Sequence, residues 1–225
     1  DLARIIKEAF YIATTGRPGP VVIDVPVDIS NAMHKFEYPD EISIRGYKPT
    51  YDGHPGQIQK ASRLIEESSK PVIYAGGGVV LSNASDELRQ FVQKTGIPIT
   101  TTLLGMGIYP ETDPLSLEML GMHGTYYANY AVHNCDLLIA VGARFDDRVT
   151  GKLSEFAPNA KVIHIDIDPA SVSKNVLVDV PIVGDCKKIL HEMNKIITTP
   201  EITSWVKEVQ KIKKDHPLQY DESSD

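Results

Sequence analysis

The sequence predicts an α/β fold built on a doubly wound parallel sheet with helices on both faces. Three observations support this prediction. Short runs of almost continuously apolar residues recur along the chain, segments with helical spacing of apolar residues separate them, and glycine or polar residues follow nearly every run. Strands that are buried on both faces have such runs, and their alternation with helices is typical of a parallel sheet.

The first part of the chain has the pattern of a helix, a turn and a strand. Apolar residues recur at helical spacing over Leu2–Thr15, Gly16 is placed to end this helix, and Pro18 cannot continue it. The β-branched run Val21–Val25 predicts a strand that Pro26 closes. We interpret residues 1–30 as the remnant of a preceding domain. Residues 31–54 read as a linker, because the periodicity fades and Pro and Gly punctuate the segment.

Strands and helices alternate over residues 55–198, which we predict to be one Rossmann-like domain. The expected strands are Val72–Ala75, Ile97–Thr101, Leu137–Val141, Val162–Ile167 and Ile182–Val183. The expected helices are Ile58–Ser68, Ala84–Thr95, Tyr126–His133 and Cys186–Ile197. Residues 199–225 are expected to comprise a polar helix, Glu201–His216, which holds the single tryptophan, Trp205, and a disordered acidic tail, Leu218–Asp225.

Composition and charge exclude several classes of protein. The 225 residues are 42% hydrophobic and 24% charged, which is ordinary for a soluble globular chain. A net charge of -7 without a basic run argues against nucleic-acid binding. The longest apolar runs fall far short of the ~20 residues that a membrane helix needs, and no signal peptide is visible. The chain begins at Asp1, within a predicted helix, so we expect a fragment of a longer protein.

The cysteines and histidines indicate neither disulfides nor a metal site. Cys135 and Cys186 are too few for a disulfide framework and are predicted to be core thiols, which fits a reducing, cytoplasmic setting. The histidines lack the spacing of metal ligands, so we expect no metal bound by them.

Every predicted strand runs into glycine, a hydroxyl or a charged residue. In doubly wound sheets, ligands bind beyond the carboxyl ends of the strands. The segments that follow the predicted strands are Gly76–Gly78, Thr101–Gly107, Gly142–Arg148, Asp166–Pro169 and Gly184–Asp185. Because this arrangement recurs at successive strand ends, the sequence predicts a ligand-binding site along that edge.

The residue types at these strand ends suit a dinucleotide. Glycines let backbone amides approach a pyrophosphate closely, and Arg144 and Arg148 supply fixed positive charge. Asp166 is placed to accept hydrogen bonds from ribose hydroxyls, and Asp185 follows the same logic at the next strand. Thr102 offers a further hydroxyl.

Several of these signals have a structural alternative. Gly76–Gly78 does not match GxGxxG and could be a ligand contact or simply a tight turn. Asp146 and Asp147 beside Arg148 could be a solvated ion-pair cluster, and His123 a helix cap or a buried structural histidine. The sequence shows no GxSxG elbow and no Walker loop. The residues alone therefore predict a ligand-binding domain with no visible catalyst.

Five segments resemble thiamine-diphosphate enzymes. Gly16–Val21 with Asp24–Pro26 resembles the end of their pyrimidine-binding domain, and Lys70–Gly78 resembles the opening of their central domain. Three later segments are more selective and resemble acetolactate synthases: Met119–Gly124, Gly142–Gly151 and His164–Pro169. The resemblance covers nearly the whole chain and weakens after about Thr198.

The resemblance implies that residues 55–198 bind FAD, which this family uses structurally and not for net redox turnover. Arg148 aligns with a family arginine near the flavin and the active-site entrance. The other implied contacts are Arg17, Gly77, Thr102, Leu103, Leu120, Gly121, Met122, His123, Gly142, Ala143, Arg144, Phe145, Asp146, Asp166, Ile167, Asp185 and Cys186. The implied parent enzyme uses thiamine diphosphate and Mg²⁺ to decarboxylate pyruvate and join the two-carbon product to pyruvate or 2-oxobutyrate, in branched-chain amino-acid synthesis.

The resemblance also implies partners: the other domains of the same chain and a parent homodimer or tetramer, with a regulatory small subunit left open. Two departures stand out. Val27 replaces a lysine that the family commonly has near its substrate entrance, which puts a typical entrance in doubt. Gly184–Cys186 lacks the second glycine of the family's metal-binding Gly-Asp-Gly motif, and the activating glutamate belongs upstream of Asp1. We therefore expect the chain alone to be catalytically inert.

Two alternatives compete with this interpretation. One is the central domain of another thiamine-diphosphate enzyme, such as a pyruvate oxidase or a carboligase, against which Met119–Gly124 and Gly142–Gly151 argue. The other is a free-standing module that binds NAD or an adenine nucleotide, against which the N-terminal helix-and-strand pattern argues.

Overall fold

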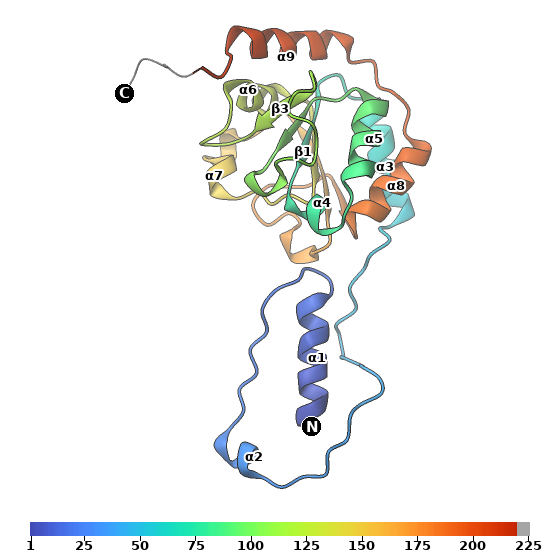
Figure 1. Cartoon of the computed structure of the whole chain (residues 1–225). Coiled ribbons are helices and arrows are strands. Elements are labelled where there is room, and N and C mark those ends of the chain that lie inside the picture. The colour runs from blue at the N-terminus through green and yellow to red at the C-terminus, as the bar shows by residue number, and fades with distance from the viewer. Residues whose placement is uncertain (220–225) are drawn as a thin grey trace, which may run out of the picture. The chain divides into compact units, whose positions relative to one another are not determined.

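The computed structural model describes residues 1–219 and divides the chain into two units, one of Asp1–Thr50 and one that starts at Tyr51 (Figure 1). The predicted tail lies outside the described residues from position 220 onward. No helix within residues 1–219 combines the length and the apolar character that a membrane crossing requires.

The first unit contains helix α1 (Leu2–Thr14), the short helix α2 (Val27–Asn31) and irregular chain. Gly16 follows α1 with a φ of +59°, so the predicted helix and its end are confirmed. The predicted strand Val21–Val25 is wrong, because this segment has no regular secondary structure. A strand needs a neighbour for its backbone groups, and no other strand is found among residues 1–50.

The second unit is built on a six-stranded sheet with the order β3-β2-β1-β4-β5-β6, in which all recorded pairs are parallel. The strands are β1 (Pro71–Ala75), β2 (Ile99–Thr101), β3 (Ser116–Met119), β4 (Leu137–Val141), β5 (Lys161–Asp166) and β6 (Val180–Val183). This order is that of a doubly wound, Rossmann-like α/β fold and confirms the predicted fold class.

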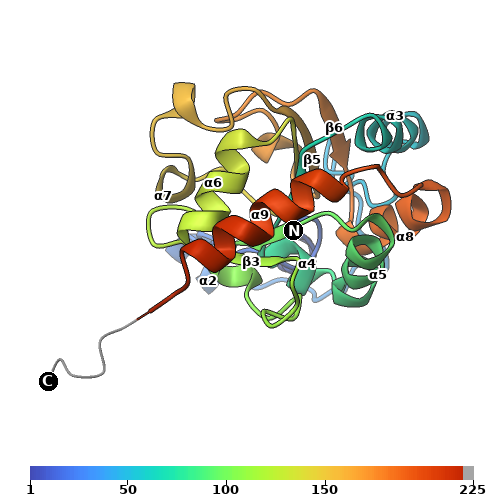
Figure 2. The ribbon, with the colours of Figure 1, turned by 90° about the horizontal axis from the view of Figure 1, so that it is seen from above.

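Helices cover both faces of the sheet (Figure 2). On one face lie α3 (Pro55–Glu66), α5 (Ser85–Thr95) and α8 (Cys186–Ile196). On the other lies α6 (Tyr126–Asn134), and α9 (Thr203–Asp215) runs across the amino-terminal ends of the strands, where it bonds the carbonyls of Pro71 and Ser116. Short helices follow several strands: α4 (Gly77–Leu81), the 3₁₀ turn η1 (Leu103–Gly105), α7 (Asp147–Thr150), η2 (Leu153–Glu155) and η3 (Pro169–Ser171).

The two central strands are buried along their whole length. Every residue of β1 and β4 is buried, which explains their uninterrupted apolar sequences. The two strands run in register from Pro71 opposite Leu137 to Ala75 opposite Val141. They therefore end side by side, and the segments that follow them start from neighbouring points.

Both cysteines are buried, as predicted for core thiols. Cys135 follows α6 and Cys186 opens α8. Burial raises the pKa of each thiol from the usual 9.0 to about 12, because a thiolate would lose its hydration. Both side chains are therefore neutral at physiological pH.

Two elements differ from the sequence-based expectation. Strand β3 was not predicted, because Ser116–Met119 mixes polar and apolar residues and lies at the edge of the sheet. The C-terminal helix was predicted as polar, yet α9 buries Trp205 and Val209 and packs on α6. In that contact the Tyr130 hydroxyl donates a 2.9 Å hydrogen bond to the Glu208 carboxylate.

Candidate functional site

The carboxyl ends of β1 and β4 form the centre of the candidate site. On either side of this pair the chain proceeds outward in opposite directions, toward β2 and β3 or toward β5 and β6. This switch point is where doubly wound sheets offer a crevice for ligands. Beyond β1 the chain enters α4 at Gly76–Gly77, and beyond β4 it forms the segment Gly142–Asp146, here called the β4 loop.

Glycines let the loops after β1, β2 and β4 pack backbone against backbone. A Cβ atom at Gly76 would lie 2.5 Å from the carbonyl oxygen of Gly142, and one at Gly78 would lie 2.6 Å from the Gly142 Cα. A Cβ at Gly105 would lie 2.7 Å from the carbonyl oxygen of Ala75. The glycine triplet forms a tight turn into α4, and neighbouring protein backbone fills the space that Gly76 and Gly78 leave.

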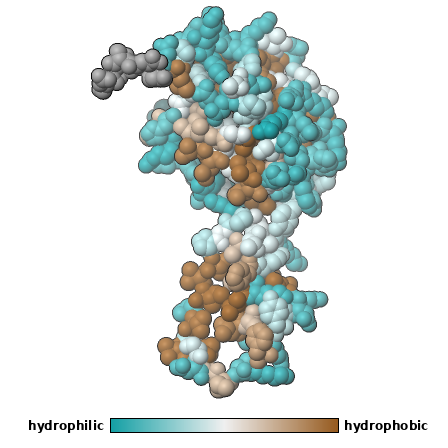
Figure 3. Space-filling model, in the orientation of Figure 1, coloured by the Kyte–Doolittle hydropathy of each residue, from teal (hydrophilic) through white to brown (hydrophobic). Residues whose placement is uncertain are grey.

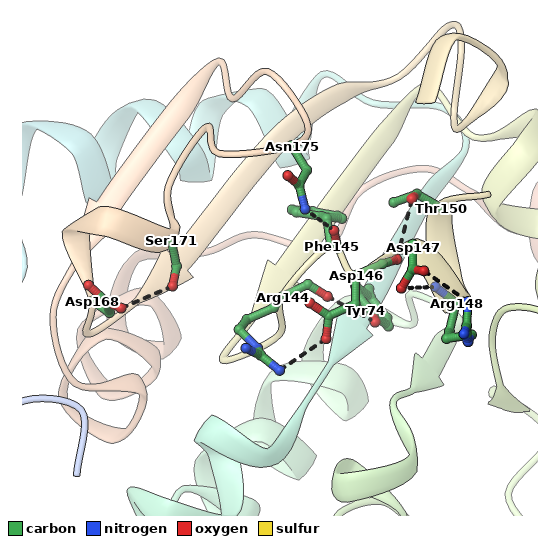
Figure 4. Close-up of polar contacts among 10 residues, drawn as sticks. All are labelled: Tyr74, Arg144, Phe145, Asp146, Asp147, Arg148, Thr150, Asp168, Ser171 and Asn175. Atoms are coloured by element: carbon green, nitrogen blue, oxygen red, sulfur yellow. Dashed lines mark hydrogen bonds and ion pairs between the residues drawn. The ribbon is translucent and has the colours of Figure 1, made fainter. Parts of the chain in front are cut away.

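Three side chains from separate segments hold the β4 loop through its backbone. The carbonyls of three consecutive loop residues each accept one hydrogen bond from a side chain, and Figure 4 shows the two to Arg144 and Phe145. The pairs are His164 Nε2 with the Ala143 carbonyl at 2.9 Å, Tyr74 Oη with the Arg144 carbonyl at 3.3 Å, and Asn175 Nδ2 with the Phe145 carbonyl at 2.6 Å. The donors come from β5, β1 and the segment that precedes β6, so the loop is fixed from three directions.

The charged residues of this region form exposed ion pairs. Arg144 lies 3.0 Å from Asp146, and Arg148 lies 2.8 Å from Asp147, with all four side chains at least half exposed (Figure 4). This arrangement agrees with the solvated ion-pair interpretation of the Asp-Asp-Arg cluster. Exposed pairs of this kind contribute at most about 1 kcal/mol, so either arginine can exchange its carboxylate partner for an anionic ligand at little cost.

Some of the predicted contact residues have buried side chains. Phe145 is 4% exposed, and its ring packs against Tyr74, Phe156 and His164 with centroid distances of 5.9, 5.9 and 5.3 Å. The thiol of Cys186 is likewise buried. In this conformation Phe145 and Cys186 can offer a ligand only their backbone groups.

The turn after β3 contacts α7, the short helix that follows the β4 loop. Gly121 has a φ of +105°, and a Cβ there would lie 2.6 Å from the Arg148 carbonyl oxygen. The Met122 N–H donates to that same oxygen over 2.9 Å. His123 is exposed, and the N-cap of α6 is Thr125, so both structural alternatives for this histidine, cap and buried residue, are wrong.

The acidic residues after β5 and β6 shape local turns. Asp166 is 8% exposed and its Oδ1 accepts the Asp168 N–H over 2.8 Å. Asp185 caps α8 by accepting the Lys188 N–H over 3.1 Å. Ile167, between Asp166 and Asp168, is partly exposed.

The segment after β2 contributes a capped turn and apolar surface. Thr102 Oγ1 accepts the Gly105 N–H over 3.1 Å, which starts η1. Exposed apolar side chains occur here and in the neighbouring segments, and Figure 3 shows apolar surface on the visible face of this unit. The exposed apolar side chains of these segments are Val80, Leu81, Leu103, Leu104, Met106 and Met122.

One predicted contact residue, Arg17, lies outside the unit that contains the sheet. Arg17 is exposed and belongs to the first unit.

Two hollows of the second unit lie away from most of the predicted residues. One of about 380 Å³ is lined by α6 and η2 and includes Leu120, and one of about 490 Å³ lies between α3 and α8.

Sequence reasoning missed the residues that hold the β4 loop. Tyr74 and Asn175 carried no signal, because a tyrosine inside an apolar strand and an asparagine in an irregular segment have no motif. His164 lies within a segment quoted for the resemblance, but its role was not foreseen. Only the tertiary contacts show that these residues converge.

The family described as "Thiamine pyrophosphate enzyme, central domain" matches residues 58–193. Curated relatives match the whole chain. The acetolactate synthase large subunit of Buchnera aphidicola subsp. Schizaphis graminum is 48% identical over 230 residues, and that of Haemophilus influenzae is 46% identical over 232 residues; the match covers 100% of this chain and 40% of each relative. The acetolactate synthase isozyme 3 large subunit of Escherichia coli is 42% identical over 234 residues, which cover 100% of this chain and 41% of that relative.

Proposed function

Because the chain belongs to the thiamine pyrophosphate enzymes, whose central domain matches residues 58–193, we propose that it is the FAD-binding central domain of an acetolactate synthase large subunit. The sequence identity of 42–48% to such subunits along the whole chain supports this assignment over another thiamine enzyme. The chain spans about two fifths of the length of these relatives, so the parent activity is part of the proposal.

The observation that carries FAD binding is the hydrogen-bonding character of the β4 loop. Its carbonyls at Ala143, Arg144 and Phe145 are engaged by protein donors. Among the described residues, no recorded hydrogen bond uses the N–H groups of positions 143–146 as donors. The backbone groups of the loop that remain for a ligand are therefore N–H donors, which suit the acceptor-rich pyrophosphate of a dinucleotide.

The residues around this loop fit the other parts of FAD. Arg144 supplies positive charge, and Asp166 and Asp185 supply carboxylates at successive strand ends for hydroxyl groups. The exposed side chains of Leu103 and Met122 provide apolar surface suited to the flavin ring. In this proposal the contacts from the second unit are completed by Gly77, Thr102, Leu120, Gly121, His123, Gly142, Arg148, Ile167 and Cys186. Arg17 belongs to the first unit, and its contact stays a prediction from the resemblance.

In the proposed parent enzyme, FAD has a structural role and thiamine diphosphate with Mg²⁺ supplies the chemistry that joins two 2-oxo acids. The residues of this chain would hold and orient the flavin nucleotide. Residues 1–30 would complete a pyrimidine-binding domain, and the chain would associate with the other domains of a cytoplasmic homodimer or tetramer.

Binding measurements on the purified chain test this proposal. We expect FAD to remain with the chain through desalting, with a flavin absorption spectrum altered from that of free FAD, and NAD to be washed away. A chain that is folded by circular dichroism but retains NAD and not FAD would contradict the proposal. For the parent activity, the full-length protein should form acetolactate from pyruvate with thiamine diphosphate, Mg²⁺ and FAD, whereas this chain alone should not.

A further inference from the structure

Three side-chain hydrogen bonds hold the β4 loop by its backbone carbonyls. Its three donors, Tyr74, His164 and Asn175, come from elements far apart in sequence, yet they engage consecutive carbonyls. The Gly142 N–H still continues the sheet by donating to the Ile165 carbonyl over 2.8 Å. The control of the loop by side chains therefore begins where the strand ladder ends.

The imidazole of His164 is the most telling of the three donors. It is fully buried, and its Nε2 lies 2.9 Å from the Ala143 carbonyl, with the nearer Asp166 oxygen at 3.7 Å. Because a carbonyl can only accept, Nε2 carries a hydrogen and is the donor of this bond. Nδ1 is buried and has no hydrogen-bond partner among the residues that the structure describes.

A buried nitrogen without a partner is unfavourable, and an apolar side chain at position 164 would avoid it. Histidine differs from an apolar residue at this position because its Nε2 donates a hydrogen bond to the Ala143 carbonyl. The same reasoning applies to Tyr74, which is buried within β1 and differs from phenylalanine only by the hydroxyl that reaches the Arg144 carbonyl. Both positions place a polar group in the core in order to hold the loop.

We propose that Tyr74, His164 and Asn175 are positioning residues for FAD. They occupy the carbonyls of positions 143–145, so that the loop presents backbone N–H groups, and not carbonyl oxygens, to the acceptor atoms of the ligand. This inference rests on the proposed function, and it concerns residues that act through the β4 loop without contacting FAD.

Single-atom and exposed-site variants of the whole chain test the proposal. Tyr74→Phe removes only the hydroxyl, and Asn175→Ala changes an exposed residue, so we expect both variants to keep the fold. We expect each to bind FAD roughly threefold to tenfold more weakly, as the loss of one hydrogen bond implies. The Kd comes from titration by flavin fluorescence, and Asn159→Ala, at another exposed asparagine, should leave it unchanged.

Rescue at position 164 separates positioning from packing. His164→Gln keeps a donor that can reach the Ala143 carbonyl, whereas His164→Leu removes it. We expect the glutamine variant to bind FAD within about threefold of the wild type and the leucine variant to bind at least tenfold more weakly, with a flavin spectrum closer to that of free FAD.

The outcomes distinguish this inference from the proposed function. A wild-type chain that binds no FAD overturns both. Tight binding by the wild type, together with Kd values within twofold for Tyr74→Phe, Asn175→Ala and His164→Leu, overturns the positioning role alone. Equal losses in His164→Gln and His164→Leu would likewise assign this position to packing.

Discussion

The indole Nε1 of Trp205 donates a 3.0 Å hydrogen bond to the carbonyl of Pro71, and this contact ties helix α9 to the first residue of strand β1. The Trp205 side chain is 1% exposed, and the Lys70 ammonium lies 5.0 Å from the centre of its ring. The C-terminal helix is therefore an integral part of the second unit.

Substitution of Trp205 should accordingly reduce stability. Trp205→Ala should lower the free energy of unfolding by about 3–5 kcal/mol, because it removes a large buried side chain. Trp205→Phe should lower it by roughly 1–2 kcal/mol, because it loses the hydrogen bond and part of the volume. Urea denaturation followed by circular dichroism measures both, and equal stability of Trp205→Ala and wild type would refute the docking of α9.

Gly78 should not tolerate a side chain. A methyl group there would lie 2.6 Å from the Gly142 Cα, a backbone atom that can move aside only if the β4 loop shifts. Gly78→Ala should lower the free energy of unfolding by roughly 1–3 kcal/mol and weaken FAD binding by displacing the β4 loop. Gly19→Ala, where nothing lies within 4 Å of the added methyl, is the control and should retain wild-type stability and affinity.

Arg144 should contribute to FAD affinity through its charge. Arg144→Gln should weaken binding about tenfold and make the Kd less sensitive to salt, because a partly exposed charge pair is screened by ions. Arg63→Gln, at an exposed arginine on α3, removes the same charge away from the site and should change neither quantity. Isothermal titration at two ionic strengths measures the effect; an unchanged salt dependence in Arg144→Gln would contradict it.

The buried thiols should make the protein less stable at high pH. Their pKa values are raised by burial from 9.0 to about 12, so the unfolded chain loses these protons first as the pH rises. Their contribution is fully present below pH 9 and declines as the pH rises toward 12, by up to ~1.4 kcal/mol per pH unit for each thiol.

A Cys135→Ala/Cys186→Ala double variant isolates this contribution. The difference in unfolding free energy between wild type and variant should be constant from pH 7 to about pH 8 and should shrink between pH 9 and 10.5. As a second check, a thiol reagent at pH 8 should modify both cysteines only after urea is added. Rapid modification of the folded chain would show that the thiols are accessible.

The sequence predicts the central strands well because strands that are buried on both faces are apolar at consecutive positions. Leu137–Val141 is apolar at every position and is β4, whereas Ser116–Met119 mixes polar and apolar residues and escaped prediction as β3. Val21–Val25 has the composition of a strand but lacks a partner among the described residues. Strand formation depends on a neighbour as well as on composition, and single-sequence reasoning does not see the neighbour.

The candidate site was predictable in its position but not in its internal support. Parallel strands bring their carboxyl ends to one edge, so the glycine and polar segments could be placed there from the sequence. That Asn175 reaches the Phe145 carbonyl and that Phe145 itself is buried depend on packing between distant segments. The exposure of His123 is a property of the same kind.

The position of β4 next to β1 has a consequence for how this chain is made. The two strands are separated in sequence by β2, β3 and α6, so β1 emerges from the ribosome well before the strand beside which it must lie. Until Val141 and the β4 loop have been synthesised, one side of β1 has no partner, and pairings of such long range form slowly. The nascent protein therefore passes through an interval with an open, apolar strand edge and an incomplete candidate site. Under the proposed function, a flavin nucleotide would stabilise only the chain that has completed the pairing.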